Sequence, residues 1–441
     1  AADEIVIKLS WTELAECVAQ MCLGAATLGE LRAFCKEVML LCAQHPLPEP
    51  NPAYDTNHKT LPSSTPPLRT AAAKGLLKLA SYKRDAALLD AIEKLLNDPD
   101  PSVRSLVAHR LFLVYSHAPE FFWQAIDERL AKEENIVVLK SVYSVLSRPG
   151  IRETQEAQTA FAAIVEELLD TNPNSELLEH IMGVLSWYMF VAKSEWVLEI
   201  GTKILNQPIK YIRPLRHLVE HISRFIVPNN VFSEEKVYIA KEAIAFAIQA
   251  LGMCKNEVVA LRENTQLERS EELRDQLQQL QQIVNTLVNG IYFNIGVPRL
   301  QGISKDELQL TEVERQQFYF FVKELLMAIS QWAIDDTLGI LAAYTAHHFC
   351  ELMNEVLKYD PVDVLQMTTN IVRSSQTSGY HFDAFAVKEV VKLADSLLAD
   401  HQEKLRDNVV LENLLTLIDI FAEAGWPEAL ELLGRLPEVA R

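Results

Sequence analysis

The segment Ala91-Ile-Glu-Lys-Leu-Leu96 indicates the architecture of the chain, because sequences of the same type return three more times. Each places apolar side chains three and four residues apart, the spacing of one face of an α-helix. Each return begins 34, 38 or 36 residues after the one before it. The returns are Ala125-Ile-Asp-Glu-Arg-Leu130, Ala163-Ile-Val-Glu-Glu-Leu168 and Glu199-Ile-Gly-Thr-Lys-Ile204.

A polar break and a second apolar segment follow each of these helix ends. The repeating unit is therefore a helix, a short turn and a second helix, about 36 residues long. One such pair cannot bury its apolar face alone, so pairs stack on their neighbours and the repeat predicts a solenoid. The predicted second helices cover residues 103–115, 136–146, 177–190 and 209–226.

The first turn of the repeat is Asn97-Asp-Pro-Asp-Pro-Ser-Val-Arg104. Asp100 can cap the helix that follows, and Pro101 can take its first position, where a missing N–H costs nothing. These residues resemble the inter-helix turn and the Val-Arg pair of the HEAT-repeat family. The resemblance implies the HEAT/armadillo class, an all-α, right-handed α-α superhelix that is elongated and curved.

Tetratricopeptide repeats, with a period of 34 residues, are the nearest alternative to this family. The sequence lacks their recurring Trp, Gly, Tyr and Pro positions. The detailed HEAT resemblance covers one unit, whereas the helix-pair periodicity covers about residues 75–227. The chain therefore resembles the HEAT/armadillo class at the level of the superfamily.

Composition agrees with a helical protein and disfavours several functions. Glycine is low, at 14 of 441 residues, and no alternating run with turn residues around it predicts a sheet. The formal net charge of −19 disfavours nucleic-acid binding, which relies on cations placed against phosphates. No uninterrupted apolar stretch predicts a membrane span. Six cysteines without short Cys-x-x-Cys pairs predict buried, reduced thiols in a cytoplasmic protein.

Four regions are expected along the chain. Residues 1–45 form an N-terminal helical pair, and the proline-rich residues 46–70 form a loop or linker. Residues 71–228 hold the HEAT-like repeats, and residues 229–441 form C-terminal helical repeats or a bundle with longer helices. Three capping boxes predict helix starts, at Ser10 with Glu13, Thr27 with Glu30 and Thr311 with Glu314.

A basic stripe is the main candidate site. Arg213, His217, His221 and Arg224 are spaced four, four and three residues apart, so they share one face of a predicted second helix. Second helices typically line the concave surface of HEAT-like stacks. The stripe therefore predicts binding of an acidic or phosphorylated protein segment. The full set of candidate residues is Lys210, Arg213, Arg216, His217, His221 and Arg224. The alternative is a solvated face paired with carboxylates of the neighbouring repeat.

A weaker set of residues raises the question of metal binding. His347 and Glu351 are four residues apart on a predicted helix and can face the same ion, with His348 beside them and Asp335 and Asp336 upstream. A di-iron bundle needs matching Glu-x-x-His pairs on two helices, and only one Glu/His pair is present. A His–Glu surface contact is the favoured interpretation, and no cofactor is expected.

The sequence predicts a protein–protein interaction scaffold or adaptor subunit rather than an enzyme. Nucleotide-binding, serine-hydrolase and zinc-protease motifs are absent from the sequence. The chain lacks an initiator Met, so one variant of this prediction is the sensor or adaptor arm of a larger protein. The competing class is an all-α enzyme, either metal-dependent or of the HEAT-like DNA glycosylase type. Trp187, Tyr188 and Trp196 near Glu195 are the candidates for the latter.

Overall fold

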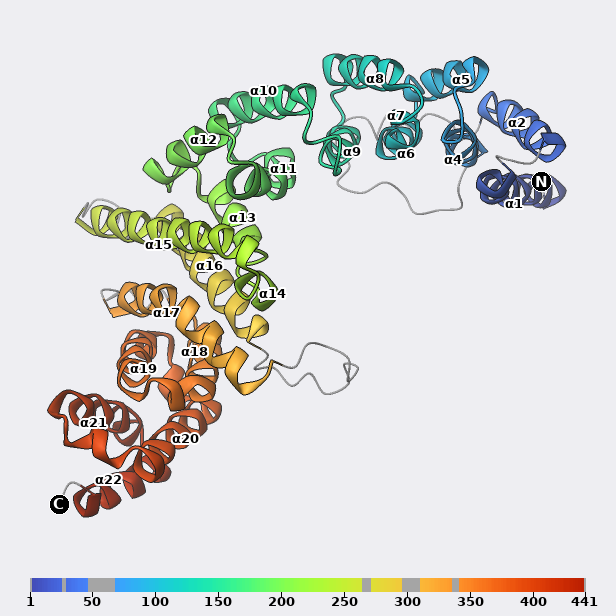
Figure 1. Ribbon diagram of the computed structural model, residues 1–441. Coiled ribbons are helices and arrows are strands. Elements are labelled where there is room, and N and C mark those ends of the chain that lie inside the picture. Colours follow the sequence, from blue (N-terminus) through green and yellow to red (C-terminus); the bar gives the residue numbers. More distant parts are fainter. Residues whose placement is uncertain are drawn as a thin grey trace. The chain divides into compact units, whose positions relative to one another are not determined.

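The computed structural model describes residues 2–25, 29–46, 68–263, 271–295, 310–334 and 341–439. All regular secondary structure in these ranges is helical, which confirms the all-α prediction (Figure 1). The chain divides into two compact units. Unit 1 comprises residues 1–167 and 175–181, and unit 2 comprises residues 168–174 and 182–441. Most of the predicted linker, residues 47–67, lies outside the described ranges.

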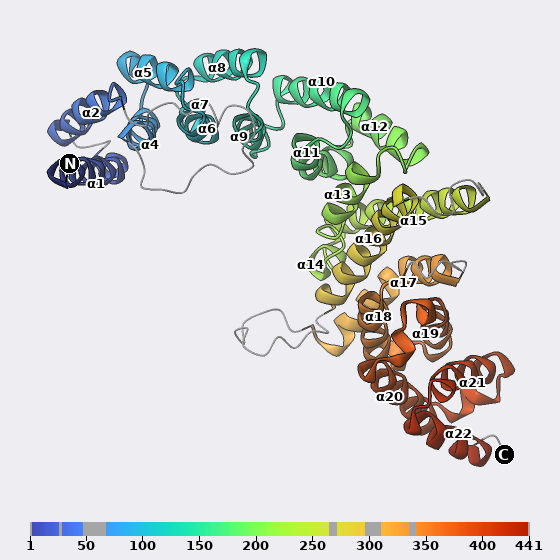
Figure 2. The same cartoon turned by 180° about the vertical axis from the view of Figure 1, so that it is seen from behind.

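Unit 1 is built from two layers of helices, as the front and back views both show (Figures 1 and 2). In each layer every helix contacts the next one along. One layer contains α1 (Ala2–Ala25), α4 (Leu68–Ala80), α6 (Pro101–Arg110) and α9 (Ile136–Leu146). The other contains α2 (Gly29–Ala43), α5 (Ala86–Leu96) and α8 (Pro119–Lys132).

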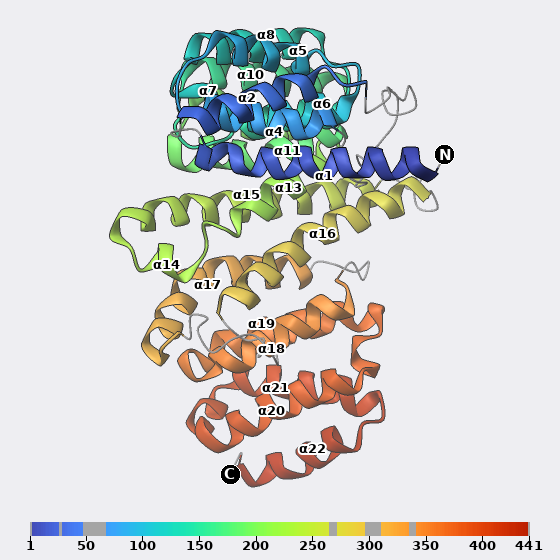
Figure 3. The same ribbon diagram turned by 90° about the vertical axis from the view of Figure 1, so that its right-hand side faces the viewer.

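Unit 2 repeats this two-layer arrangement, and Figure 3 shows its helices from residue 312 onward stacked toward the C-terminus. One layer runs through α12 (Glu195–Asn206), α15 (Glu234–Glu263), α17 (Glu312–Ile334), α19 (Pro361–Ser375) and α21 (Asn408–Glu423). The other layer, called here the second-helix layer because it holds the later helix of each pair, contains α13 (Ile212–Ile222), α16 (Glu271–Asn294), α18 (Ala343–Val356), α20 (Ala384–Asp400) and α22 (Pro427–Val439).

The remaining helices are short or cross the boundary between the units. The chain division falls within α10 (Gln155–Thr171) and α11 (Glu176–Trp187). The short elements are α7 (Phe112–Tyr115), α14 (Pro228–Val231), the π-helix η1 (Tyr188–Ala192), and the 3₁₀ turns η2 (Leu357–Tyr359), η3 (Gln376–Ser378), η4 (Tyr380–Phe382) and η5 (Gln402–Arg406).

The predicted helix caps can now be compared with the structure. The Asp100 carboxylate accepts the backbone N–H of Ser102 at 2.8 Å, with Pro101 in the first position of α6, as predicted. Thr311 and Glu314 form the reciprocal bonds of a capping box. The Ser10 prediction is wrong, because α1 begins at Ala2 and Ser10 lies inside it. Thr27 lies outside the described residues.

Three ion pairs, of which the first two are largely buried, join successive helix pairs of unit 1. Arg69 on α4 binds Asp98 through Nε–Oδ2 and Nη2–Oδ1 bonds of 2.6 and 3.0 Å. Arg104 on α6 binds Glu133 through two bonds of 2.9 and 3.0 Å. The third rung joins Lys140 on α9 to Glu176 at 2.9 Å. These three rungs, called here the inter-pair ladder, connect each second helix to an acidic residue of the next helix pair.

Helix α15 has the length and mean hydropathy of a membrane span over Glu234–Ala260. Only 39% of its most apolar segment is buried. The same helix packs against α12, α13 and α17, and buries Ala243, Ala247, Leu251 and Cys254. Length and composition are weak evidence for a span, since a packed core helix has both.

The prediction of buried thiols is correct for four of the six cysteines and wrong for Cys17, which is exposed, and Cys42, which is half-buried. Cys22, Cys35, Cys254 and Cys350 are buried free thiols. Burial raises the pKa of Cys22 to about 12, with a further contribution from the neighbouring Cys35. Cys17 is exposed instead, because it lies on the face of α1 opposite the side that packs on α4.

Candidate functional site

The residues of the predicted basic stripe lie on helix α13 or next to its ends, with Lys210 before it and Arg224 after it. Its apolar residues recur at helical spacing, and all of them are buried, mainly against α16. The buried set is Ile212, Leu215, Leu218, Val219 and Ile222. This packing fixes the rotation of the helix and determines which polar side chains reach solvent.

Three of the predicted cations are exposed and one is half-buried. Lys210, Arg213 and Arg224 are exposed, and the Lys210 ammonium lies 4.8 Å from the centre of the Tyr211 ring. The guanidinium of Arg216 donates to Nε2 of its neighbour His217 at 3.2 Å. Four cations therefore lie on or beside α13, in a chain whose net charge is strongly negative.

The two histidines of the stripe make contacts within the protein. Nε2 of His217 accepts from Arg216, so the ring proton sits on Nδ1, which lies 3.3 Å from the Glu220 carboxylate. His221 is half-buried against Gly183 of α11, where an added Cβ would lie 2.9 Å from the imidazole. Burial, together with the charge of Arg224, lowers the pKa of His221 to about 4. His221 is therefore neutral at pH 7.

The second candidate cluster lies on α18. His347 Nε2 lies 3.7 Å from the Glu351 carboxylate, as the spacing of four residues predicts. The other carboxylate oxygen of Glu351 accepts from the Tyr292 hydroxyl of α16 at 2.5 Å. Both burial and this bond to a carboxylate raise the pKa of Tyr292.

The His348 ring contacts other side chains of the protein. Its Nδ1 lies 2.8 Å from the side-chain oxygen of Asn289, and its ring stacks on Tyr292 with centroids 4.2 Å apart. Burial lowers the pKa of His348. Among the described residues no group of three His, Cys, Asp or Glu side chains is arranged to hold a metal ion. Asp335 and Asp336, the predicted upstream carboxylates, lie outside those residues.

The aromatic residues of the enzyme alternative pack on one another. Tyr188 is fully buried, with its ring centroid 5.3 Å from that of Trp187 and 5.7 Å from that of Trp196. Glu195 is exposed in the first turn of α12. Core packing accounts for these rings, as expected for aromatic residues at helical spacing.

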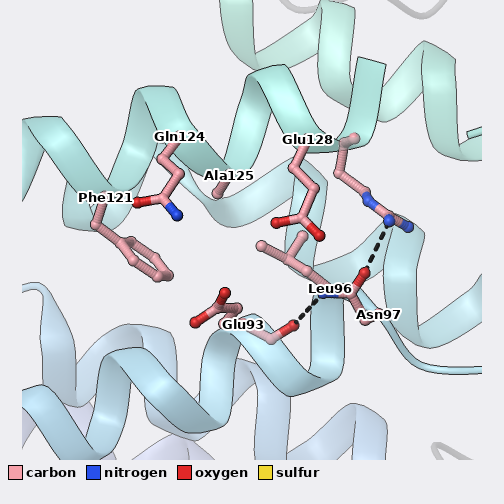
Figure 4. Close-up of a pocket in the computed structure, with 8 residues that line it drawn as sticks. Glu93, Leu96, Asn97, Phe121, Gln124, Ala125 and Glu128 are labelled. Carbon is pink, nitrogen blue, oxygen red and sulfur yellow. Dashed lines mark hydrogen bonds between the residues drawn. The ribbon is translucent and has the colours of Figure 1, made fainter. Parts of the chain in front are cut away.

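Each unit has a pocket on its described surface. Figure 4 shows the first, between α5 and α8, where Glu93, Phe121 and Gln124 surround a space of about 10 Å³, enough for one water molecule. Asn97 also lines this pocket, and its side-chain oxygen accepts a hydrogen bond from Arg129 at 2.9 Å. The second pocket, of about 420 Å³, is open and lies along α20. It is lined by Val387, Lys388, Val391, Lys392, Asp395, Ser396 and Glu428.

The sequence does not predict the aromatic side chains that surround His347 and His348. Tyr344 lies 4.0 Å from His348 between ring centroids, Phe293 lies 6.4 Å from His348, and Phe385 lies 6.0 Å from His347. These three aromatic side chains come from α18, α16 and α20. A helical wheel of α18 puts Tyr344, His348 and Glu351 on one face, but nothing in the sequence places the other two helices beside it.

Comparisons with known proteins add no functional assignment. No protein-family model and no curated protein matches the chain. A crystal structure of an engineered protein aligns over 93% of this chain and 95% of its own length, with 14% sequence identity and a TM-score of 0.22. A similarity at this level carries no argument about fold or function.

Proposed function

We propose that the protein is an interaction scaffold of the HEAT-like class, a right-handed superhelix whose α13 surface binds an acidic or phosphorylated segment of a partner protein. The observation that carries this proposal is the packing of α13. The helix buries its apolar residues and leaves Lys210, Arg213 and Arg224 exposed in an otherwise acidic chain. Guanidinium groups bind carboxylates and phosphates through paired hydrogen bonds, which gives such a surface its specificity.

The inter-pair ladder supports the repeat part of the proposal. It links Arg69, Arg104 and Lys140 to acidic residues about one helix pair further along the chain. Each pair thereby contacts its neighbour in the same manner, as in arrays of stacked repeats. Small-angle X-ray scattering tests the superhelix: we expect a radius of gyration well above the ~22 Å of a compact protein of this length.

Binding to degenerate peptide pools tests the α13 surface. We expect a pool with a fixed phosphothreonine to bind more tightly than the same pool with threonine. The double variant Arg213→Ala/Arg216→Ala should weaken this binding about tenfold or more, because each charged hydrogen bond contributes about 1.5–3 kcal/mol. Arg406→Ala, an exposed arginine on η5, is the matched control.

Two results would exclude this surface. Equal binding of the phosphorylated and unphosphorylated pools would show that α13 does not select anions. An unchanged affinity in the double variant, with unfolding curves like those of the unsubstituted protein, would place the anion site elsewhere.

A further inference from the structure

The surface around Glu351 lies across three neighbouring helices of the second-helix layer. Helix α18 contacts α16 on one side and α20 on the other. Tyr344, His348 and Glu351 lie along one face of α18, since they are four and three residues apart. Phe293 and Phe385 flank this face from α16 and α20.

Three large aromatic side chains of this surface are exposed to solvent. Phe293, Tyr344 and Phe385 are 52%, 58% and 64% exposed. Exposed apolar residues are common singly, but these three are joined by ring contacts through His347 and His348 into one continuous patch. Large aromatic rings gathered in this way supply the anchors of binding surfaces.

The Glu351 carboxylate, 3.7 Å from the His347 ring of this patch, has no lysine or arginine partner among the described residues. Glu351 accepts from the Tyr292 hydroxyl and lies near His347, and in the described part of the chain no Lys or Arg forms an ion pair with it. Its side chain is only 28% exposed, so its charge is poorly screened by water. Glu355, one turn further along α18, by contrast pairs with Arg315 and Lys392.

A half-buried carboxylate among exposed aromatic rings is complementary to one chemical group. A lysine or arginine side chain donates a charged hydrogen bond to the carboxylate and forms cation–π contacts with the rings. Lys388, whose ammonium lies 5.6 Å from the centre of the Phe385 ring, shows such a contact within the protein. The net charge of −19 attracts basic partners over longer distances.

We propose that Phe293, Tyr344, His347, His348 and Phe385 form, around Glu351, a docking site for a partner peptide that inserts a lysine or arginine side chain next to an apolar residue. The apolar neighbour packs on the exposed aromatic rings, and the cation pairs with Glu351. This site is separate from the α13 surface and selects the opposite charge. The protein therefore presents two sites for two kinds of partner.

The test begins with the full-length protein on an array of random dodecapeptides. We expect bound peptides to be enriched in Arg or Lys beside aliphatic or aromatic residues. The tightest peptide is then resynthesised with its cation replaced by citrulline or norleucine, and dissociation constants are measured by fluorescence anisotropy. Loss of the charge should weaken binding about tenfold or more, as expected for a hydrogen bond to a charged group.

Matched variants separate this site from general attraction to an acidic protein. Glu351→Gln should weaken binding of the peptide about tenfold. Glu403→Gln, which removes an exposed charge from η5 in the same unit, should change it less than twofold. Phe385→Ala should weaken binding several-fold. Phe34→Ala, at an exposed phenylalanine of unit 1, should leave it unchanged.

Three outcomes would overturn the proposal. These are an array without preference for cations, equal effects of Glu351→Gln and Glu403→Gln, and an unchanged NMR signal of the His348 ring on peptide addition. Unfolding curves of each variant confirm that the protein remains folded. Arg213→Ala/Arg216→Ala should leave the affinity for this peptide unchanged. The α13 proposal and the Glu351 proposal can therefore fail independently of each other.

Discussion

Arg104 and Glu133 form two parallel hydrogen bonds, of 2.9 and 3.0 Å, across two successive helix pairs of unit 1. Glu133 also accepts from Arg129 at 3.2 Å, and the Arg104 guanidinium donates to the Asp98 carbonyl. All three charged side chains are largely buried. One carboxylate therefore pairs with two guanidinium groups at the junction between repeats, and its loss removes the counter-charge that the two groups share.

Glu133→Gln should consequently destabilise the protein by about 3 kcal/mol or more, because breaking a buried ion pair leaves uncompensated charge. Urea unfolding followed by circular dichroism measures the change. Arg84→Ala is the control, since its pair with Glu120 is exposed and should contribute less than about 1 kcal/mol. Equal effects of the two substitutions would contradict a structural role for the ladder.

Asp100→Ala should cost about 1 kcal/mol of stability. The substitution removes the carboxylate that accepts the Ser102 N–H at the start of α6. Asp127→Ala is the control, because Asp127 is exposed in the interior of α8 and does not cap a helix. This substitution should change stability by less than about 0.5 kcal/mol. A shift in the unfolding midpoint for Asp100→Ala alone would support the assignment of this cap.

Gly183→Ala tests the close approach of α11 and α13. Alanine favours the helix by up to about 1 kcal/mol over glycine, but its Cβ would lie 2.9 Å from the His221 ring. We expect a net destabilisation of about 1–2 kcal/mol from this clash. In a His221→Ala background the same substitution should become stabilising, so a double-mutant cycle detects the coupling.

Acidification should destabilise the protein partly through His221. Its pKa is about 4 when folded and about 6.5 when unfolded, so the unfolded chain binds more protons between these values. Stability should therefore fall as pH drops from 6.5 to 4, by about 0.5–1 kcal/mol per unit after solvent screening. Burial lowers the pKa of His109 and His180 as well, and their contributions have the same sign. The difference in slope between the unsubstituted protein and His221→Gln isolates this one residue.

Thiol labelling should distinguish one cysteine from the other five. Cys17 is exposed, so it should react quickly in the native state. Burial raises the pKa of Cys42, a half-buried thiol that should react more slowly. All six should react in denaturant, and Cys17→Ser should abolish the fast phase. Rapid native labelling of Cys22 or Cys35 would contradict the packing of α1 and α2 on α4.

The candidate sites were only partly predictable from the sequence. Helical spacing predicts a shared face for Arg213, His217 and His221, but it could not show that His221 turns toward Gly183 and loses its charge through burial. The contact of His347 with Glu351 follows from a spacing of four residues. The rings of Phe293 and Phe385 reach the same place from helices distant in sequence, so no local pattern identifies them.

The sequence alone determined the helical class, the pairing of helices with a period near 36 residues, and the caps at Asp100 and Thr311. These features depend on side-chain spacing and on hydrogen bonds within a few residues, which are local properties. The tertiary structure was needed to show that Glu133 pairs with Arg104, as Asp98 pairs with Arg69 in the rung before it. It was also needed to show that Glu351 lies next to a patch of exposed rings. Both depend on which helices pack side by side, because burial and counter-charges come from residues far away along the chain.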